Sequence, residues 1–112
     1  MSTILHITPL ASWEQAVEAG ELRPESLESE GFIHTSTFDQ VVRVANAFYA
    51  GQTGLVLLCI DTNRVHSPIQ WERAVDVDDT FPHIYGPLNT DAVTEVLAFE
   101  PDSEGRFTLP VV

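Results

Sequence analysis

Apolar residues in this chain follow two patterns, a continuous run and a helical repeat. Residues 55–60 are all apolar, which is typical of a central strand that is covered on both faces. Thr37 and Gln40 form a capping-box pattern before residues 38–50, and Gly51 follows them. We therefore expect a helix over residues 38–50 that packs one apolar face against a sheet. That face would contain Val41, Val44, Ala45, Phe48 and Tyr49, which recur at spacings of three and four.

A shorter helix is predicted near the start of the chain. Ser12 and Gln15 repeat the capping-box spacing, so this helix should run over residues 13–19. Gly20 should end it, because glycine readily adopts the left-handed conformation found just past a helix. Residues 21–31 are polar and acidic, and we expect them to form a surface loop with room for one helical turn.

Short runs rich in β-branched and aromatic residues predict the remaining strands. They are residues 3–8, 32–36, 69–72, 81–85, 94–99 and 106–109. Pro82 should place its strand at a sheet edge or make its pairing irregular, because proline has no N–H to donate. Residues 102–105 are expected to form a hairpin loop, and Trp13 and Trp71 to be packing residues rather than stacking platforms for a ligand. About seven strands with two early helices indicate one α+β domain over residues 1–112.

The charge balance excludes several classes of function. Seventeen acidic residues against five basic ones give a net charge of −12, which would repel the phosphates of duplex nucleic acid. All five basic residues are arginines, so Schiff-base chemistry and a P-loop lysine are excluded. No apolar run approaches the length of a membrane span or of a secretion signal, so we expect a cytoplasmic protein. Cys59, inside an apolar strand, is expected to be a buried core thiol.

Three predicted strands share a pattern that suggests a ligand site. Each carries a histidine followed two positions later by a hydroxyl side chain: His6 with Thr8, His34 with Ser36, and His83 with Tyr85. Residues two apart in a strand point to the same face, so each pair presents an imidazole beside a hydroxyl. Such pairs suit a ribose diol or a phosphate. The alternative is three strand histidines that bond to the backbone, whereas His66 lies in a turn and is expected to be solvated.

Glu72 is the acidic residue that stands apart from the acidic runs, because it follows an apolar and aromatic stretch. A carboxylate in this position can stabilise developing positive charge, and His83 can act as general acid or base. The alternative for Glu72 is a surface ion pair with an arginine. Arg23 and Arg73 are the cations best placed to meet a phosphate. Imidazole and carboxylate ligands suit zinc or manganese, so a metal site from His6, His34, His83 and Glu72 is an alternative. No local spacing typical of a metal site supports it, and no metal is predicted.

The sequence resembles a small bacterial family of single-domain proteins known as a domain of unknown function, and the resemblance covers essentially the whole chain. The motifs that carry it include Leu5-His6-Ile7, Glu30-Gly31-Phe32-Ile33-His34, Leu57-Leu58-Cys59-Ile60-Asp61, Trp71-Glu72 and Phe81-Pro82-His83-Ile84-Tyr85-Gly86-Pro87-Leu88. This family is similar in fold to the ADP-ribosyltransferases, which cleave the bond between nicotinamide and ribose in NAD. The resemblance implies a split, mostly antiparallel sheet around a nucleotide cleft.

The same resemblance implies roles for individual residues. His6 matches a histidine that hydrogen-bonds a ribose hydroxyl, and Glu72 matches a glutamate that stabilises the oxocarbenium-like transition state. Where those enzymes place a nicotinamide-stacking tyrosine, this chain has His34 and Ser36, and Tyr85 follows the glutamate.

Three functions remain as hypotheses. The first is an enzyme that uses NAD or a related ADP-ribosyl compound as its substrate, and the second is a non-catalytic module that binds a nucleotide or small ligand. The third compares the paired His-x-Ser/Thr motifs with those of cyclic-phosphate phosphoesterases, although those enzymes are larger and have motifs farther apart.

Overall fold

The computed structural model describes residues 2–75 and 78–110. Its helices are α1 (Leu10–Ala19), α2 (Glu25–Ser29) and α3 (Phe38–Phe48), with short 3-10 turns η1 (Thr62–Arg64) and η3 (Thr90–Ala92). Its strands are β1 (Thr3–Pro9), β2 (Glu21–Leu22), β3 (Ile33–His34), β4 (Leu55–Asp61), β5 (Ile69–Ala74), β6 (Asp79–Ile84), β7 (Leu88–Asn89) and β8 (Val93–Phe99). The α+β class predicted from the sequence is confirmed. The strands differ from the expected set because β2 and β7 are present and residues 106–109 form no strand.

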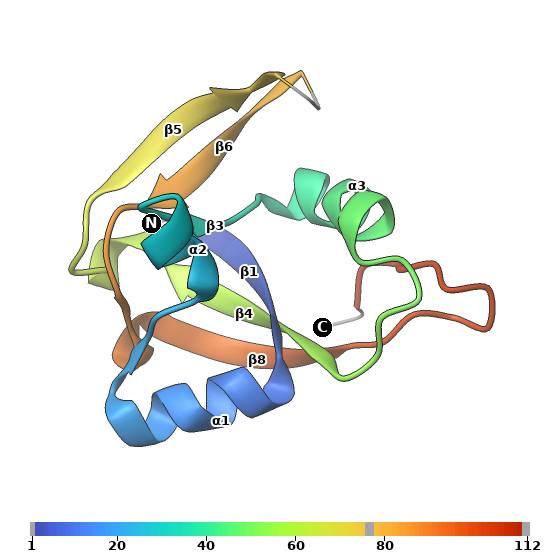
Figure 1. Ribbon diagram of the computed structural model, residues 1–112, viewed down its shortest axis with the longest axis horizontal. Coiled ribbons are helices and arrows are strands. Elements are labelled where there is room, and N and C mark those ends of the chain that lie inside the picture. The colour runs from blue at the N-terminus through green and yellow to red at the C-terminus, as the bar shows by residue number, and fades with distance from the viewer. Residues whose placement is uncertain (1, 76–77, 111–112) are drawn as a thin grey trace.

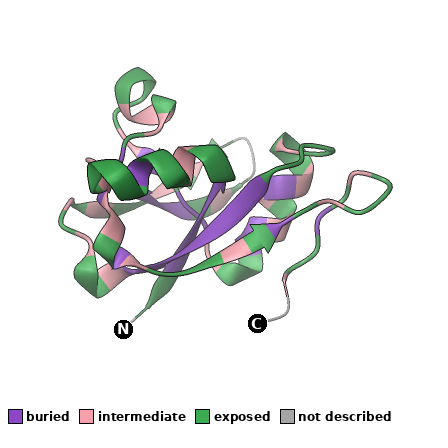
Figure 2. Cartoon of the chain, turned by 90° about the horizontal axis from the view of Figure 1, so that it is seen from below, coloured by how far each residue is buried: buried purple, intermediate pink, exposed green. Residues whose placement is uncertain are grey.

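The strands pair antiparallel in three sheets. Their orders are β1-β4-β8, β3-β6-β5 and the small pair β2-β7. In Figure 1 the β5–β6 hairpin lies on the opposite side of β1 and β4 from α1, so the two larger sheets occupy different parts of the molecule. Burial is concentrated in the central strands, whereas the helices are exposed along much of their length (Figure 2).

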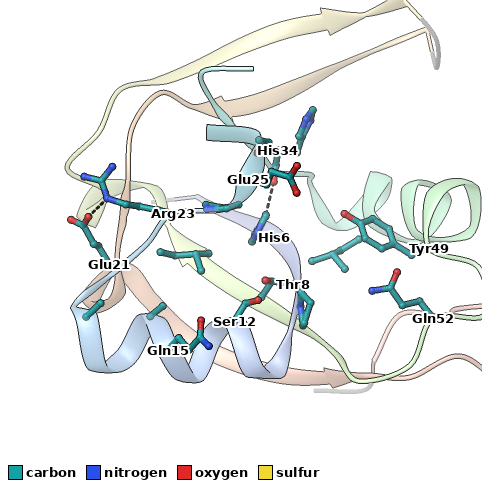
Figure 3. A pocket seen from close by; sticks show the side chains of 17 residues that line it. His6, Thr8, Ser12, Gln15, Glu21, Arg23, Glu25, His34, Tyr49 and Gln52 are labelled. Atoms are coloured by element: carbon teal, nitrogen blue, oxygen red, sulfur yellow. Dashed lines mark hydrogen bonds and ion pairs between the residues drawn. The ribbon is translucent and has the colours of Figure 1, made fainter. Parts of the chain in front are cut away.

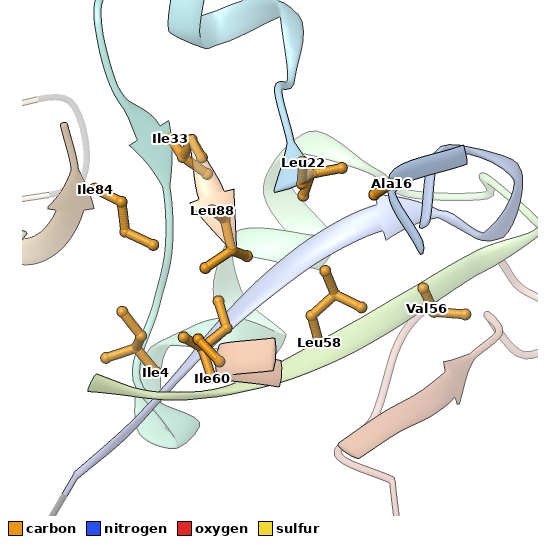
Figure 4. Close-up of a cluster of buried hydrophobic side chains, with 10 residues drawn as sticks. Ile4, Ala16, Leu22, Ile33, Val56, Leu58, Ile60, Ile84 and Leu88 are labelled. Carbon is orange, nitrogen blue, oxygen red and sulfur yellow. The ribbon is translucent and has the colours of Figure 1, made fainter. Parts of the chain in front are cut away.

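The predicted central strand is confirmed, because β4 lies between β1 and β8 and all seven of its residues are buried. Alternate residues face two separate apolar clusters. Val56, Leu58 and Ile60 pack in the cluster that Ala16 of α1 covers (Figure 4). Leu55, Leu57 and Cys59 face the second cluster, which α3 covers. Cys59 is buried in this second cluster, as expected of a core thiol.

Helix α3 begins with the predicted capping box, in which Thr37 and Gln40 bond each other's backbone N–H groups. Its buried face differs from the prediction. Val41 and Ala45 are fully buried, but Phe48 is 65% exposed. The helix ends at Phe48, short of residue 50, while Val44 and Tyr49 are half-buried and pack against the second cluster.

Helix α1 begins at Leu10, three residues earlier than predicted, and Ser12 does not cap it. The N-cap is Pro9, and the N–H of Leu10 donates to the carbonyl of Gly54 at 2.9 Å. A backbone partner thus replaces the expected side-chain cap. Gly20 ends the helix in the left-handed conformation, as predicted, with φ of 86°. None of the described helices is long and apolar enough to cross a bilayer.

The prediction for residues 21–31 is confirmed in part. The expected helical turn is present as the five-residue helix α2, but residues 21–22 form β2 rather than a loop. Trp71, expected to be a packing residue, is 54% exposed, and β5 is the edge strand of its sheet. Trp13 packs against the apolar cluster that Ala16 of α1 covers, as expected.

Pro82 does not lie at a sheet edge, because β6 is the middle strand of its sheet. The hydroxyl of Thr35 donates to the carbonyl of Pro82, so this carbonyl points toward the β3 side. The missing N–H points the same way, since both groups of one residue in an antiparallel strand face one side. The β3 ladder ends at His34, opposite His83, so the proline removes no hydrogen bond from it.

The segment expected to form a last strand is held by a side chain instead. The N–H of Phe107 donates to Oδ1 of Asn46 at 2.7 Å, and the Asn46 amide donates to the Phe107 carbonyl at 3.2 Å. Asn46 therefore supplies the two bonds that a neighbouring strand would give, and the Phe107 ring stacks on Phe99 in the core. Residues 102–105 form a turn, but without a second strand they do not join a hairpin.

Candidate functional site

The segment that follows β3 is hydrogen-bonded to the edge of the other large sheet, and we call this junction the seam. Here Ser36 pairs with Leu5 on the free edge of β1, through N–H to carbonyl bonds of 2.7 and 2.8 Å. Beside this pair, Nδ1 of His6 lies 2.7 Å from the carbonyl oxygen of His34. The seam therefore brings together two of the three histidine pairs that the sequence singled out.

Two cavities open beside the seam, and His34 and Tyr49 line both of them. The first, which we call the polar cavity, has a volume of about 670 Å³. Its walls include His6, Thr8, Ser12, Gln15, Arg23 and Gln52 (Figure 3). The second, which we call the aromatic cavity, has a volume of about 530 Å³. Its walls include Phe32, Ser36, Phe48, Phe81 and His83.

The hydrogen bond of His6 fixes which ring nitrogen carries the proton. A carbonyl only accepts, so Nδ1 must donate to His34, and Nε2 of the neutral ring is then an acceptor. Burial lowers the pKa of His6 to about 4, which keeps the ring neutral at physiological pH. His6 therefore offers the polar cavity a neutral hydrogen-bond acceptor, suited to a hydroxyl or N–H of a ligand.

His83 is oriented by a carboxylate. Its Nδ1 donates to Oε1 of Glu72 at 2.8 Å, and the Tyr85 hydroxyl donates to the same oxygen. The bonds from Tyr85 and His83 hold the pKa of the Glu72 carboxyl below its usual range, so it stays ionised. The hydrogen bond from Tyr85 to Glu72 raises the pKa of the Tyr85 hydroxyl. Because Nδ1 is occupied, Nε2 of neutral His83 is the nitrogen free to accept a proton.

Aromatic rings gather around His83 and His34. Phe32 stacks on His83 with ring centroids 4.0 Å apart and an angle of 18°, and it meets His34 edge-on at 4.9 Å. The two imidazoles lie 5.5 Å apart. Nε2 of His34 is 2.8 Å from Oε2 of Glu30, near the C-terminal end of α2. The imidazole rings of His34 and His83 are thus held by packing against Phe32 and by hydrogen bonds to carboxylates.

The two arginines that the sequence proposed as phosphate partners are already paired. Arg23 bonds Glu21 at the rim of the polar cavity, and Arg73 bonds Asp78 at the aromatic cavity. Both arginine side chains are 65% exposed. A phosphate would have to compete with a carboxylate for either of them.

The predicted site residues divide into three groups. His6, Thr8 and Arg23 line the polar cavity, Ser36 and His83 line the aromatic cavity, and His34 lines both. Glu72 and Tyr85 lie behind His83 and are not among the described residues that line either cavity. Within residues 2–75 and 78–110, no three side chains of the ligating types come together as a metal site requires.

Sequence reasoning missed Phe32, Glu30 and Tyr49. A signal for Phe32 was present, because it lies two residues before His34 in the predicted strand over residues 32–36, although β3 itself begins at Ile33. Tyr49 gave no such signal, since it was assigned to the core face of the long helix. It packs against the cluster that α3 covers, at the C-cap of this helix, as expected, and it also lines both cavities.

Together these features define an α+β protein with a histidine-lined cleft at the junction of two antiparallel sheets. Residues 7–96 match a family described as a protein of unknown function (DUF952), and the chain belongs to this family.

Solved structures of one protein from Caulobacter crescentus, CC0527, are similar to this chain over nearly its whole length. The crystal structure has 29% identity and a TM-score of 0.87, covering 96% of this chain and 95% of that chain. A crystal structure of a double mutant has 29% identity and a TM-score of 0.86 over the same shares. The solution NMR structure has 30% identity and a TM-score of 0.81, covering 95% of this chain and 91% of that chain. No curated protein matches the sequence.

Proposed function

We propose that this protein binds a nucleoside-containing ligand across the seam, with NAD or another ADP-ribosyl compound as the first candidate. One observation carries the proposal: a polar and an aromatic cavity of similar size meet at His34 and Tyr49. A nucleoside has the same two halves, a hydroxylated sugar joined to a planar ring.

The polar cavity suits the sugar. His6 supplies a neutral acceptor, Thr8 and Ser12 supply hydroxyls that donate or accept, and Gln52 supplies an amide. A diol needs both donors and acceptors, and the walls of this cavity provide both. The resemblance to the ADP-ribosyltransferases, in which a first-strand histidine binds ribose, agrees with this role for His6.

The aromatic cavity suits the ring. Phe32, Phe81 and the imidazole of His34 line it, and stacking of a base on an aromatic side chain is worth about 1–3 kcal/mol. Ser36 adds a hydroxyl at the seam end of the cavity. A planar base placed here would leave its sugar near His34, where the polar cavity begins.

Replacing His34 by alanine is expected to weaken NAD binding at least about tenfold, because this residue lines both cavities. The melting temperature should barely change, since the side chain is 55% exposed and its bond to Glu30 is a surface pair. Calorimetry with NAD, ADP-ribose and adenosine at millimolar concentration and low salt measures the effect. The matched control is His66→Ala, which removes an exposed imidazole outside the described walls of both cavities. Absence of heat with all three compounds would refute the proposal.

Hydrolytic turnover of the bound nucleotide is a second candidate, favoured by the Glu72–His83 pair. In this scheme Nε2 of His83 takes a proton from a water molecule that attacks the anomeric carbon of ribose. The carbon–nitrogen bond breaks, and its electron pair leaves with the base. Glu72 acts through His83 by holding Nδ1–H and stabilising the imidazolium, which differs from the direct role that the resemblance implies.

Glu72→Gln separates binding from turnover. Glutamine keeps an oxygen that accepts from His83 but loses the charge that stabilises the imidazolium, so NAD affinity should persist while nicotinamide release falls about 10²–10⁴-fold. Release is measured by chromatography of the reaction mixture, and affinity by calorimetry. Binding of NAD by the unaltered protein with no release of nicotinamide would instead identify a non-catalytic binding module.

A further inference from the structure

We infer that the cleft selects ligands whose aromatic ring is positively charged, such as N-alkylated bases of nucleosides, over neutral rings and over phosphorylated ligands. The inference rests on the proposed nucleoside-binding function and ranks its candidate ligands. It favours NAD, whose nicotinamide ring is positively charged, over ADP-ribose, which has the same phosphates and no charged ring, and it favours a cationic nucleoside without phosphates over both. Three features of the cleft carry it: aromatic faces, carboxylates that lie beside them, and the absence of an unpaired cation among the described residues that line the cavities.

The aromatic faces come first. Phe32, Phe48 and Phe81 line one cavity together with Tyr49, and each of these rings has an electron-rich face. A cation that lies within about 6 Å of such a face is attracted by the ring quadrupole, and the attraction is stronger where water is excluded. A neutral base stacks on the same rings but gains no such charge term.

Carboxylates reinforce the preference. Glu30 lines the aromatic cavity, and Glu72 lies directly behind His83. Glu25 also lines the polar cavity, whereas the charge of Glu21 there is balanced by its ion pair with Arg23. The chain as a whole carries a net charge of −12, so the field around the cleft favours cations at long range as well.

The arginines of the cleft do not reverse this balance. Arg23 is bonded to Glu21, and Arg73 is bonded to Asp78. His6 is neutral and offers an acceptor, which repels a phosphate oxygen rather than binding it. A phosphate group in the cleft would therefore face carboxylates and acceptors, and would have to break an ion pair to find a cation.

Two isomeric nucleosides test the inference. 1-Methyladenosine carries a positive ring at neutral pH, whereas N6-methyladenosine has the same mass and sugar and is uncharged. We expect calorimetry at low salt to give the charged isomer about tenfold tighter binding, a preference that shrinks as salt is added. Adenosine should also bind more tightly than its 5′-monophosphate.

A variant assigns the preference to the cleft. Glu30→Gln should reduce the ratio of the two affinities, because it removes the carboxylate that lines the aromatic cavity. Glu95→Gln, an equal change of charge at an exposed position of β8 outside the described cavity walls, should leave the ratio unaltered.

The outcomes are distinct for the two proposals. Equal affinity for the two isomers, or tighter binding of the monophosphate than of adenosine, would overturn the charge preference while the nucleoside-binding function stands. If neither isomer nor adenosine binds, both proposals fail.

Discussion

Val41→Asp is expected to leave the protein unfolded at room temperature. Val41 is fully buried on α3, between the helix and the cluster that contains Leu57 and Phe99. A carboxylate there would have no partner, and burying an unpaired charge costs several kcal/mol of the about 5–15 kcal/mol that stabilise a typical domain. Circular dichroism during urea unfolding would show a lost or strongly shifted transition.

Two changes on the same helix serve as controls. Ala47→Asp adds the same carboxylate at an exposed position and should alter the free energy of unfolding by less than about 1 kcal/mol. Val44→Asp, at a half-buried position beside the aromatic cavity, should fall between the two. A Val41→Asp protein that unfolds like the Ala47→Asp protein would show that the packing of α3 is wrongly described.

Acidification is expected to destabilise the protein well above the range in which carboxylates titrate. The folded pKa of His6 is lowered to about 4 by burial, against an ordinary value of 6.5. Below pH 6.5 the unfolded chain therefore binds a proton that the folded chain does not. The free energy of unfolding should be at its maximum above about pH 7 and should fall by about 2 kcal/mol between about pH 7 and about pH 5. Urea unfolding at a series of pH values measures this slope.

His6→Asn identifies the source of the slope, since asparagine does not titrate. This variant should be less stable at neutral pH but should show a much flatter dependence between about pH 7 and about pH 5. The carboxyl groups of Glu72, Asp79 and Asp102 have lowered pKa values. Their contributions to the free energy of unfolding are therefore lost only at lower pH, as the pH falls through their folded pKa values. A slope that is unchanged in the variant would mean that His6 is not the residue responsible.

Local chemistry made part of the fold predictable. The capping box at Thr37 and Gln40, the stop at Gly20 and the fully apolar strand β4 each follow from a short stretch of sequence, and each is present. Where tertiary partners supplied the bonds, sequence reasoning failed. Leu10 uses the carbonyl of Gly54 in place of a side-chain cap, and Phe107 uses the Asn46 amide in place of a strand.

Strand geometry allowed each histidine to be paired with the hydroxyl residue two positions later, because residues two apart in a strand share a face. The relation between the strands did not follow, since only the fold shows that β1 and the chain after β3 meet at Leu5 and Ser36. Glu72 was singled out by its neighbours in sequence, but its contact with His83 arises from cross-strand pairing of β5 with β6. That pairing turned an expected direct role into a proposed positioning role.

The two larger sheets are joined in two ways, by the hydrogen bonds between Leu5 and Ser36 and by an apolar cluster that both sheets share. In this cluster Ile33 and Ile84 pack with residues of β1 and β4. Because the sheets bury this surface against each other, we expect them to unfold together rather than one at a time. A ligand that filled both cavities would contact residues on both sides of the junction, and its binding would stabilise the junction further.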